Sequence, residues 1–164
     1  MELLEGIVRI DDLDAFLATV DEVADRHGTT VQAFDARYVA GRDHLERAVE
    51  LAERAIDRGD TVARDPAVEI LCYAAGRRQI ERALEMGVSE GEHATVLLAT
   101  GGDETGAIDA LADRLDLDQR AVLTDPDEER LTAFFEITDA EQRATDASLE
   151  ELVCERVALL VVEK

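Results

Sequence analysis

Lysine and aromatic residues are scarce in this chain of 164 residues. Lys164 is the only lysine, so sixteen of the 17 basic residues are arginine, and Phe, Tyr and Trp together make up 4% of the chain. Against these bases stand 39 acidic residues, which give a formal net charge of -22. The hydrophobic fraction of 46% is still high enough for a packed core, so the composition excludes an intrinsically disordered acidic chain.

The acidic residues are spread along the whole chain and are not gathered in a tail. That distribution, with arginine in place of lysine and small Ala and Val in place of aromatic rings, is typical of cytoplasmic proteins of extreme halophiles, whose carboxylates keep the surface hydrated in concentrated salt. We therefore attribute the charge to habitat. At roughly 1 M salt the Debye length is about 3 Å, so the charge does not exclude an anionic partner such as a nucleic acid.

Long apolar runs and paired cysteines are also missing. The longest apolar run, residues 157–162, is far shorter than the ~20 residues that span a bilayer, and no basic start followed by an apolar stretch suggests a signal peptide. Cys72 and Cys154 form no CxxC pair and fall on the apolar sides of helical patterns, which predicts buried thiols. We expect a soluble cytoplasmic protein with no membrane partner.

The residue groupings of common active sites are absent as well. The three histidines, His27, His44 and His93, are scattered, and neither a nucleophile motif nor a zinc-spaced grouping of Cys and His accompanies them. We therefore expect no catalytic residue, no metal, no cofactor and no small-molecule substrate.

Apolar periodicity and turn residues divide the chain into interleaved strands and helices. Strands are expected at residues 3–10, 31–40 and 94–100. Helices are expected at residues 13–27, 42–58, 66–86, 104–118, 125–137 and 147–160, and Val161 and Val162 either continue the last helix or form an edge strand. This order predicts an α+β fold, in which one domain over residues 1–164 has a small mixed β-sheet surrounded by several α-helices.

The stretch EILCYAAGRRQIERALEMGV, residues 69–88, places two adjacent arginines in a predicted helix. On a helical wheel Arg77 and Gln79 fall on the two borders between the apolar and charged faces, on either side of Gly76. A glycine inside a helix costs roughly 1 kcal/mol relative to alanine, so we expect another element or a ligand to approach Gly76 closely. Arg78 also has an ordinary explanation, because glutamates lie one turn along the helix.

The stretch AGRDHLERA, residues 40–48, is the second candidate. His44 lies at the edge of the apolar stripe of its helix, and Gly41 and Arg42 precede it. It is either a partly buried histidine bonded to a backbone carbonyl or a residue that contacts a ligand.

These two stretches together resemble a known family. The block VQAFDARYVAGRDHLERAVELA (residues 31–52) is followed by DPAVEILCYAAGRRQIERALEMGV (residues 65–88), which gives a strand, then Gly-x-x-His opening an alanine-spaced helix, then Glu-Ile-Leu and Arg-Gln-Ile. The terminal ELVCERVALLVV (residues 151–162) is similar to the family's closing helix. The pattern resembles the regulatory subunits of the KEOPS complex, called the PRPK-binding protein (TPRKB) family in animals, and the composition suggests a haloarchaeal-type member.

The resemblance implies a non-catalytic subunit of the complex that installs threonylcarbamoyl on adenosine 37 of tRNA (t6A37). Such a subunit binds and stimulates the small kinase-like ATPase subunit and, in archaea, holds the single-stranded CCA end of the tRNA. The matching tRNA-binding positions are Gly41, His44, Arg77, Gln79 and Ile80, to which we add the neighbours Arg42 and Arg78 for their chemistry. The stripe of Val153, Val157 and Leu160 in the closing helix is either a partner interface or simply core.

Two other functions stay open at this point. One is a small stand-alone phosphoester or nucleotide-processing enzyme that uses His44 with Arg77 and Arg78, and the other is a structural adaptor that binds the partner but no RNA. Turnover of a nucleotide by the protein alone would favour the enzyme. Loss of tRNA-dependent stimulation on changing Arg77 and Gln79 would favour the RNA-holding subunit.

Overall fold

The computed structural model describes residues 1–163 and divides the chain into two compact units, each built from two segments. Residues 1–36 and 87–122 form the first, which we call the sheet unit. Residues 37–86 and the chain from residue 123 onward form the second, which we call the helical unit. That all 164 residues make one domain stays a prediction.

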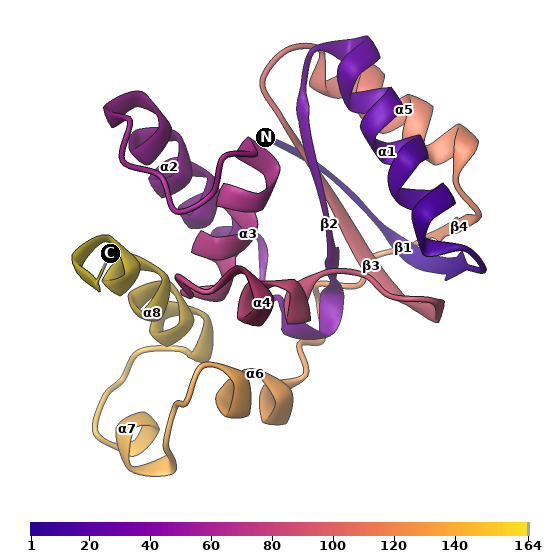
Figure 1. Cartoon of the computed structure of the whole chain (residues 1–164). Helices are drawn as coiled ribbons and strands as arrows, with labels where there is room; N and C mark the ends of the chain where they lie inside the picture. Colours follow the sequence, from indigo (N-terminus) through magenta and orange to yellow (C-terminus); the bar gives the residue numbers. More distant parts are fainter. Residues whose placement is uncertain (164) are drawn as a thin grey trace. The chain divides into compact units, whose positions relative to one another are not determined.

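The sheet unit contains one four-stranded sheet with the order β2-β3-β1-β4 (Figure 1). Its strands are β1 (Glu2–Ile10), β2 (Thr30–Asp35), β3 (Gly91–Thr100) and β4 (Leu117–Gln119). Every hydrogen-bonded pair is antiparallel, so the α+β class is confirmed but the expectation of a mixed sheet is wrong. The reason is that β1 and β2, which run in the same direction, are not neighbours, because β3 pairs between them.

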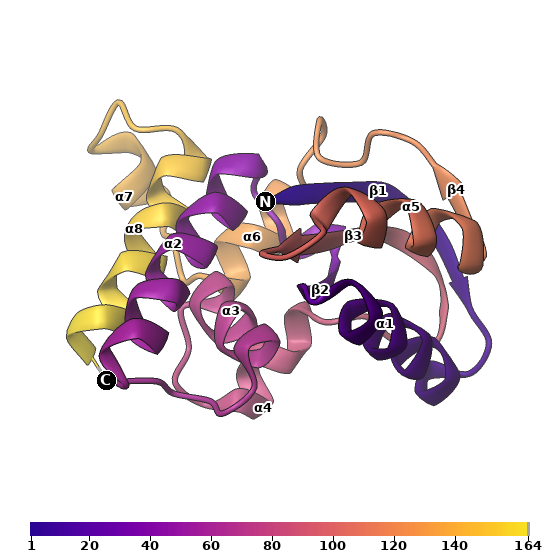
Figure 2. The same cartoon turned by 90° about the horizontal axis from the view of Figure 1, so that it is seen from above.

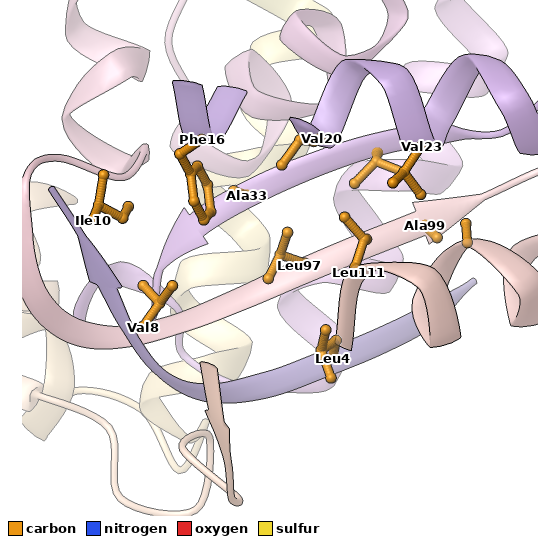
Figure 3. Close-up of a cluster of buried hydrophobic side chains, with 12 residues drawn as sticks. Leu4, Val8, Ile10, Phe16, Val20, Val23, Ala33, Leu97, Ala99 and Leu111 are labelled. Carbon is orange, nitrogen blue, oxygen red and sulfur yellow. The ribbon is translucent and has the colours of Figure 1, made fainter. Parts of the chain in front are cut away.

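Two helices cover one face of this sheet, α1 (Leu13–His27) and α5 (Glu104–Arg114). Figure 3 shows Phe16, Val20 and Val23 of α1 and Leu111 of α5 pointing at side chains from β1, β2 and β3. The alternation of apolar residues along the strands places them on that one face. This cluster therefore follows from the period of each element. Its buried members are Leu4, Val8, Ile10, Phe16, Val20, Val23, Val31, Ala33, Leu97, Ala99, Ala107 and Leu111.

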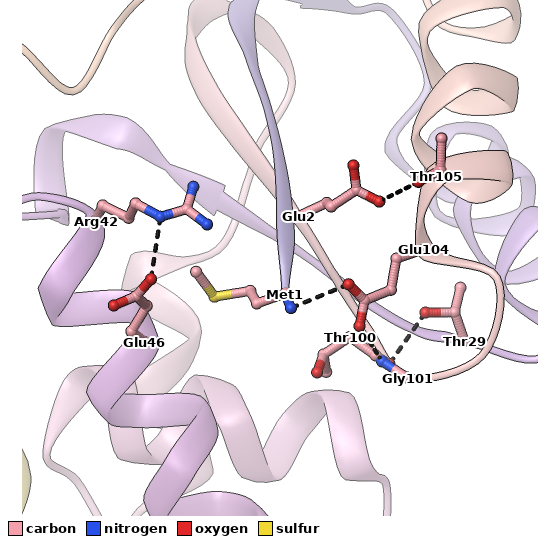
Figure 4. A network of polar contacts seen from close by, with 9 residues as sticks. All are labelled: Met1, Glu2, Thr29, Arg42, Glu46, Thr100, Gly101, Glu104 and Thr105. Atoms are coloured by element: carbon pink, nitrogen blue, oxygen red, sulfur yellow. Dashed lines mark hydrogen bonds and ion pairs between the residues drawn. The ribbon is translucent and has the colours of Figure 1, made fainter.

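A polar network fixes the turn between β3 and α5 (Figure 4). The carboxylate of Glu104 accepts a hydrogen bond from the Gly101 N–H at 2.7 Å and pairs with the amino group of Met1 at 3.0 Å. The Thr29 hydroxyl donates to the carbonyl of Thr100 at 3.0 Å. The carboxylate of Glu104, in the first turn of α5, thus has its partners within the sheet unit.

The helical unit is built around three packed helices, α2 (Arg42–Arg58), α3 (Pro66–Ala75) and α8 (Leu149–Glu163), as Figure 2 shows. Shorter elements complete it: the 3-10 turns η1 (Ala36–Tyr38) and η2 (Leu84–Met86), and the helices α4 (Ile80–Ala83), α6 (Glu128–Phe134) and α7 (Asp139–Arg143). Small residues allow the helices to pack closely, since Ala48, Ala52 and Ala74 are fully buried.

Several expected boundaries differ from the structure, among them those of the helix expected over residues 125–137, which is the shorter α6. The strand expected over residues 31–40 ends at Asp35, and a 3-10 turn follows. The helix expected over residues 104–118 stops at Arg114, because Leu115 takes an extended conformation that leads into β4. The helix expected over residues 66–86 is broken after Ala75. Of the two possibilities left open for Val161 and Val162, the structure shows the first, because both residues continue α8.

Candidate functional site

Gly76 ends α3 and does not lie inside a helix. Its φ of +61° is in the left-handed region that favours glycine, and its N–H donates to the carbonyl of Tyr73 at 3.0 Å. A Cβ atom there would lie 3.1 Å from the carbonyl oxygen of Arg156 in α8. The expected close approach of another element is therefore confirmed. The helical wheel was wrong, because the helix ends at Gly76 and so does not place Arg77 and Gln79 on the borders between an apolar and a charged face.

The residues after Gly76 form a short surface loop that leads into α4. Arg78, Gln79 and Ile80 are exposed, and the Ile80 side chain keeps 41% of its surface accessible. Gln79 stands at the N-cap of α4, but its side-chain amide makes no capping bond to the first turn of that helix. We call residues 77–80 the arginine loop.

Arg77 differs from its neighbours because its side chain is held within the helical unit. Its Nη2 donates to the carbonyl of Phe134, its Nη1 lies 3.8 Å from a carboxylate oxygen of Glu136, and its guanidinium stacks over the Phe134 ring at 5.1 Å. Only 20% of the side chain is exposed. Arg77 therefore anchors the arginine loop against α6.

His44 is fully buried in the first turn of α2. Its Nδ1 accepts from the Ala40 N–H at 3.1 Å, which leaves Nε2 as the protonated nitrogen that donates to the Ala74 carbonyl at 2.7 Å. Burial lowers the pKa of His44 to about 4, so the imidazole is neutral at neutral pH. The bond to Ala74, two residues before Gly76, ties the start of α2 to the end of α3.

Gly41 makes room for a carboxylate from another helix. It stands at the N-cap of α2 and has no side chain to cap it, but the Glu150 carboxylate of α8 accepts from the His44 N–H at 3.2 Å. A Cβ on Gly41 would lie 2.7 Å from the carboxyl carbon of Glu150. The glycine thus allows α8 to cap α2. Arg42 is exposed and pairs with Glu46 at 3.1 Å.

Removing this cap is expected to destabilise the protein modestly. Glu150→Ala leaves the His44 N–H without its acceptor, and loss of a helix cap costs about 1 kcal/mol. Urea unfolding followed by circular dichroism measures this change, with Glu155→Ala on the exposed side of α8 as the control. Equal stability of the two variants would show that the Glu150 carboxylate does not cap α2.

The structure therefore brings the two predicted stretches together but divides their roles. His44, Gly41 and Arg77 support the site from within, whereas Arg78, Gln79 and Ile80 are presented to solvent. The predicted ligand contact of His44 would need access that its fully buried ring lacks. That these residues bind tRNA stays a prediction.

The stripe proposed as a partner interface lies in the core. Val153, Val157 and Leu160 have no exposed surface, because this side of α8 packs within the helical unit. The opposite side of the same helix carries exposed apolar side chains instead, with Leu159 at 46% and Val162 at 80% exposure. The period of the helix identified the apolar face, but it could not show whether that face packs in the core of this protein or against a partner protein.

An aromatic cluster beside Arg77 was not identified from the sequence. The rings of Tyr38 and Phe134 meet edge to face at 5.2 Å, and Phe135 contacts both Phe134 and His44 in the same way. The sequence did contain a sign of this cluster, because Tyr38, Phe134 and Phe135 are three of only six aromatic residues in the chain.

Both thiols have raised pKa values. Cys72 is buried and Cys154 partly buried, and burial raises the pKa of each to about 11.

Within residues 1–163 no group of three or more His, Cys, Asp or Glu side chains is placed to hold a metal ion. In that same range, none of the helices has the length and apolar character needed to cross a membrane.

Comparison with known proteins gives one family. No curated protein matches the chain. A family model described as "Kinase binding protein CGI-121" matches residues 16–160, which include the arginine loop, the start of α2 and most of α8. The match covers most of the chain and agrees with the resemblance that the Gly-x-x-His and Arg-Gln-Ile motifs indicated. The chain belongs to the CGI-121 family of kinase-binding proteins, the family that includes the KEOPS regulatory subunits.

Proposed function

We propose that this protein is the non-catalytic regulatory subunit of a KEOPS complex, which binds and stimulates the kinase-like ATPase subunit and holds the 3′ CCA end of the tRNA during t6A37 formation. The observation that carries the proposal is the family match over residues 16–160, because that family is described as kinase-binding. The test is to measure ATP hydrolysis by the purified kinase-like subunit with and without this protein. A rise in the partner's rate supports a regulator, and an unchanged rate argues against one.

The exposed side of α8 is the surface that we assign to the kinase-like subunit. Leu159 and Val162, one turn apart on α8, are 46% and 80% exposed on a chain rich in acidic residues. Apolar side chains that lie together in such a surface are typical of a protein interface. Both point away from the buried face of α8, which Val157 and Leu160 occupy.

Charged substitutions on this surface are expected to weaken kinase binding. Leu159→Glu with Val162→Glu places two carboxylates in the interface, and leaving even one charge without a partner there should lower the affinity at least tenfold. Calorimetric titration of the kinase-like subunit measures the effect. Leu17→Glu is the matched control, because Leu17 is 40% exposed on α1 of the sheet unit. Kinase affinity that is the same in both variants would exclude this face of α8.

The arginine loop is the surface that we assign to the unpaired end of the tRNA. Phosphate contacts gain affinity by releasing counterions, and this gain fades as the salt concentration approaches molar values. Contacts to bases must therefore supply the affinity in a halophilic protein. Arg78 can stack on a base, Gln79 can bond to a base edge and Ile80 offers an apolar surface, and all three are exposed.

The two alternatives differ in how well the site supports them. An enzyme that uses His44 would need its imidazole to exchange protons with a substrate, but both ring nitrogens are bonded to backbone groups in the core. We therefore do not propose an enzymatic function. A structural adaptor shares the kinase-binding surface, and it is distinguished by the tRNA measurements described below.

A further inference from the structure

A small pocket of the helical unit brings the arginine loop next to the side of α8 that we assign to the kinase-like subunit. The pocket has a volume of about 190 Å³. Arg77, the first residue of the loop, and Leu159 of α8 both line it, and Glu136 and Arg156 add charged groups to the lining. The pocket lining therefore includes residues from both of the proposed binding surfaces.

Arg156 of α8 holds the turn that connects α6 to α7. Its Nε donates to the carbonyl of Phe135 at 3.1 Å, and its Nη2 donates to the carbonyl of Glu136 at 3.2 Å. The same Nη2 lies 2.6 Å from a carboxylate oxygen of Glu141 in α7. Glu136 has a φ of +55°, in the left-handed region that residues with a side chain disfavour. The turn therefore needs support from outside itself, and the guanidinium of Arg156 supplies it.

The arginine loop is attached to this turn as well. Arg77 donates to the carbonyl of Phe134 and lies 3.8 Å from the carboxylate of Glu136. The Nε of Arg77 is buried, and no group within residues 1–163 accepts a hydrogen bond from it. The position of Arg77 therefore depends on its contacts with the turn and with the Phe134 ring. Since Arg156 holds the turn, a shift of Arg156 would move the anchor of the arginine loop.

Leu159 connects this arrangement to a partner bound at α8. It follows Arg156 by about one helical turn, lines the same pocket and is exposed. A partner seated on Leu159 would exclude water from the pocket, and hydrogen bonds between charged groups strengthen where water is excluded. The bonds that Arg77 and Arg156 make to the turn would then hold the arginine loop more firmly.

We propose that Arg156 is a positioning residue that couples the kinase-binding side of α8 to the arginine loop, so that the kinase-like subunit and tRNA bind to this protein cooperatively. This inference rests on the proposed function. Arg156 touches neither partner and acts through the carbonyls of Phe135 and Glu136. A loop that one partner has already ordered costs the other less to bind, so each partner raises the affinity for the other by the same factor.

The test measures tRNA affinity with and without a saturating amount of the kinase-like subunit, by fluorescence anisotropy in concentrated potassium chloride. For the unmodified protein the kinase-like subunit should raise the affinity about fivefold, at the lower end of typical couplings between sites. Arg156→Lys keeps the charge, but an ammonium group lacks the planar fork that reaches the two carbonyls and Glu141, so the rise should disappear. Arg143→Lys, which changes an exposed arginine of α7, should keep the rise.

A second variant decides the matter if Arg156→Lys does not fold. Glu141→Gln leaves both carbonyl bonds of Arg156 in place and removes only its charged partner, so the rise should become smaller. Urea unfolding of each variant separates a loss of folding from a loss of coupling. In that case an unchanged rise in Glu141→Gln would exclude the coupling.

Failure of the proposed function and failure of the coupling give different results. If the unmodified protein does not bind tRNA or does not bind the kinase-like subunit, the proposed function fails. If it binds both but the kinase-like subunit leaves the tRNA affinity unchanged, the function survives and the coupling is excluded. If the rise persists in a folded Arg156→Lys variant, the kinase-like subunit contacts the tRNA itself, and the role assigned to Arg156 is wrong.

Discussion

Lowering the pH from 6.5 to 4 is expected to remove about 3 kcal/mol of folding stability through His44 alone. The pKa of His44 is about 4 in the folded protein and 6.5 in the unfolded chain, where the imidazole is exposed to water. Between these values the unfolded chain takes up the proton and the folded protein does not. The stabilisation is therefore complete above pH 6.5 and is lost as the pH falls towards 4.

The measurement is urea unfolding across this pH range for the unmodified protein and for His44→Gln, at one fixed salt concentration. Carboxylates titrate in both proteins, so the difference between the two curves isolates the histidine. The variant should be less stable near pH 7, because the Ala40 N–H and Ala74 carbonyl lose their partner, and the difference should shrink as the pH falls. His27→Gln, whose imidazole is partly exposed, is the control. A gap between the His44→Gln and unmodified curves that does not depend on pH would contradict the buried neutral imidazole.

Replacing Arg78 and Gln79 together with alanine is expected to weaken tRNA binding between about fivefold and 150-fold. The range corresponds to the loss of one base contact of about 1–3 kcal/mol. Folding stability should stay unchanged, because both residues are exposed in the arginine loop. Anisotropy with labelled tRNA in concentrated potassium chloride measures the affinity, and the ATPase rate of the kinase-like subunit with tRNA measures the consequence.

The matched control is Arg54→Ala, which removes an exposed arginine from α2, paired there with Glu50. It changes the net charge as the double variant does but does not touch the arginine loop. Arg77→Ala is a poor choice for this test, because loss of its bonds to α6 would disturb the loop by itself. Kinase stimulation and tRNA affinity that survive in Arg78→Ala with Gln79→Ala would indicate the structural adaptor.

The ends of α1 and α2 and the start of α3 were predicted correctly from the sequence. Asp12 caps α1 by accepting from the Ala15 N–H, and Asp65 with Pro66 opens α3. Gly59 closes α2 with a φ of +68°. These signals are local, since each depends on the geometry of one turn, and so they can be predicted without knowing the rest of the fold.

Features that depend on distant contacts could not be predicted in the same way. The antiparallel sheet depends on β3 being inserted between β1 and β2, and no residue near these strands marks that order. Gly76, by contrast, ends α3 with the same left-handed cap that Gly59 gives α2, so its signal was local and the apolar pattern over residues 66–86 concealed it.

The residues of the candidate site all lie in the helical unit, but some of them are buried and others are exposed. The motif residues Gly41 and His44 are explained by packing, since one admits the Glu150 carboxylate and the other holds the end of α3. Glycine and histidine are suited both to packing and to ligand contacts, so residue type alone could not separate these two roles. The burial of both residues in the structure separates them.

Binding of intact tRNA, compared with the same tRNA trimmed of its 3′ tail, tests the proposed RNA-holding role most directly. The measurement is made in concentrated potassium chloride, where contacts to phosphates contribute little. We predict that the intact tRNA binds and that trimming removes most of the affinity, because the arginine loop grips unpaired bases and not the folded body of the tRNA. Equal binding of the two tRNAs, or binding of neither, would contradict that role.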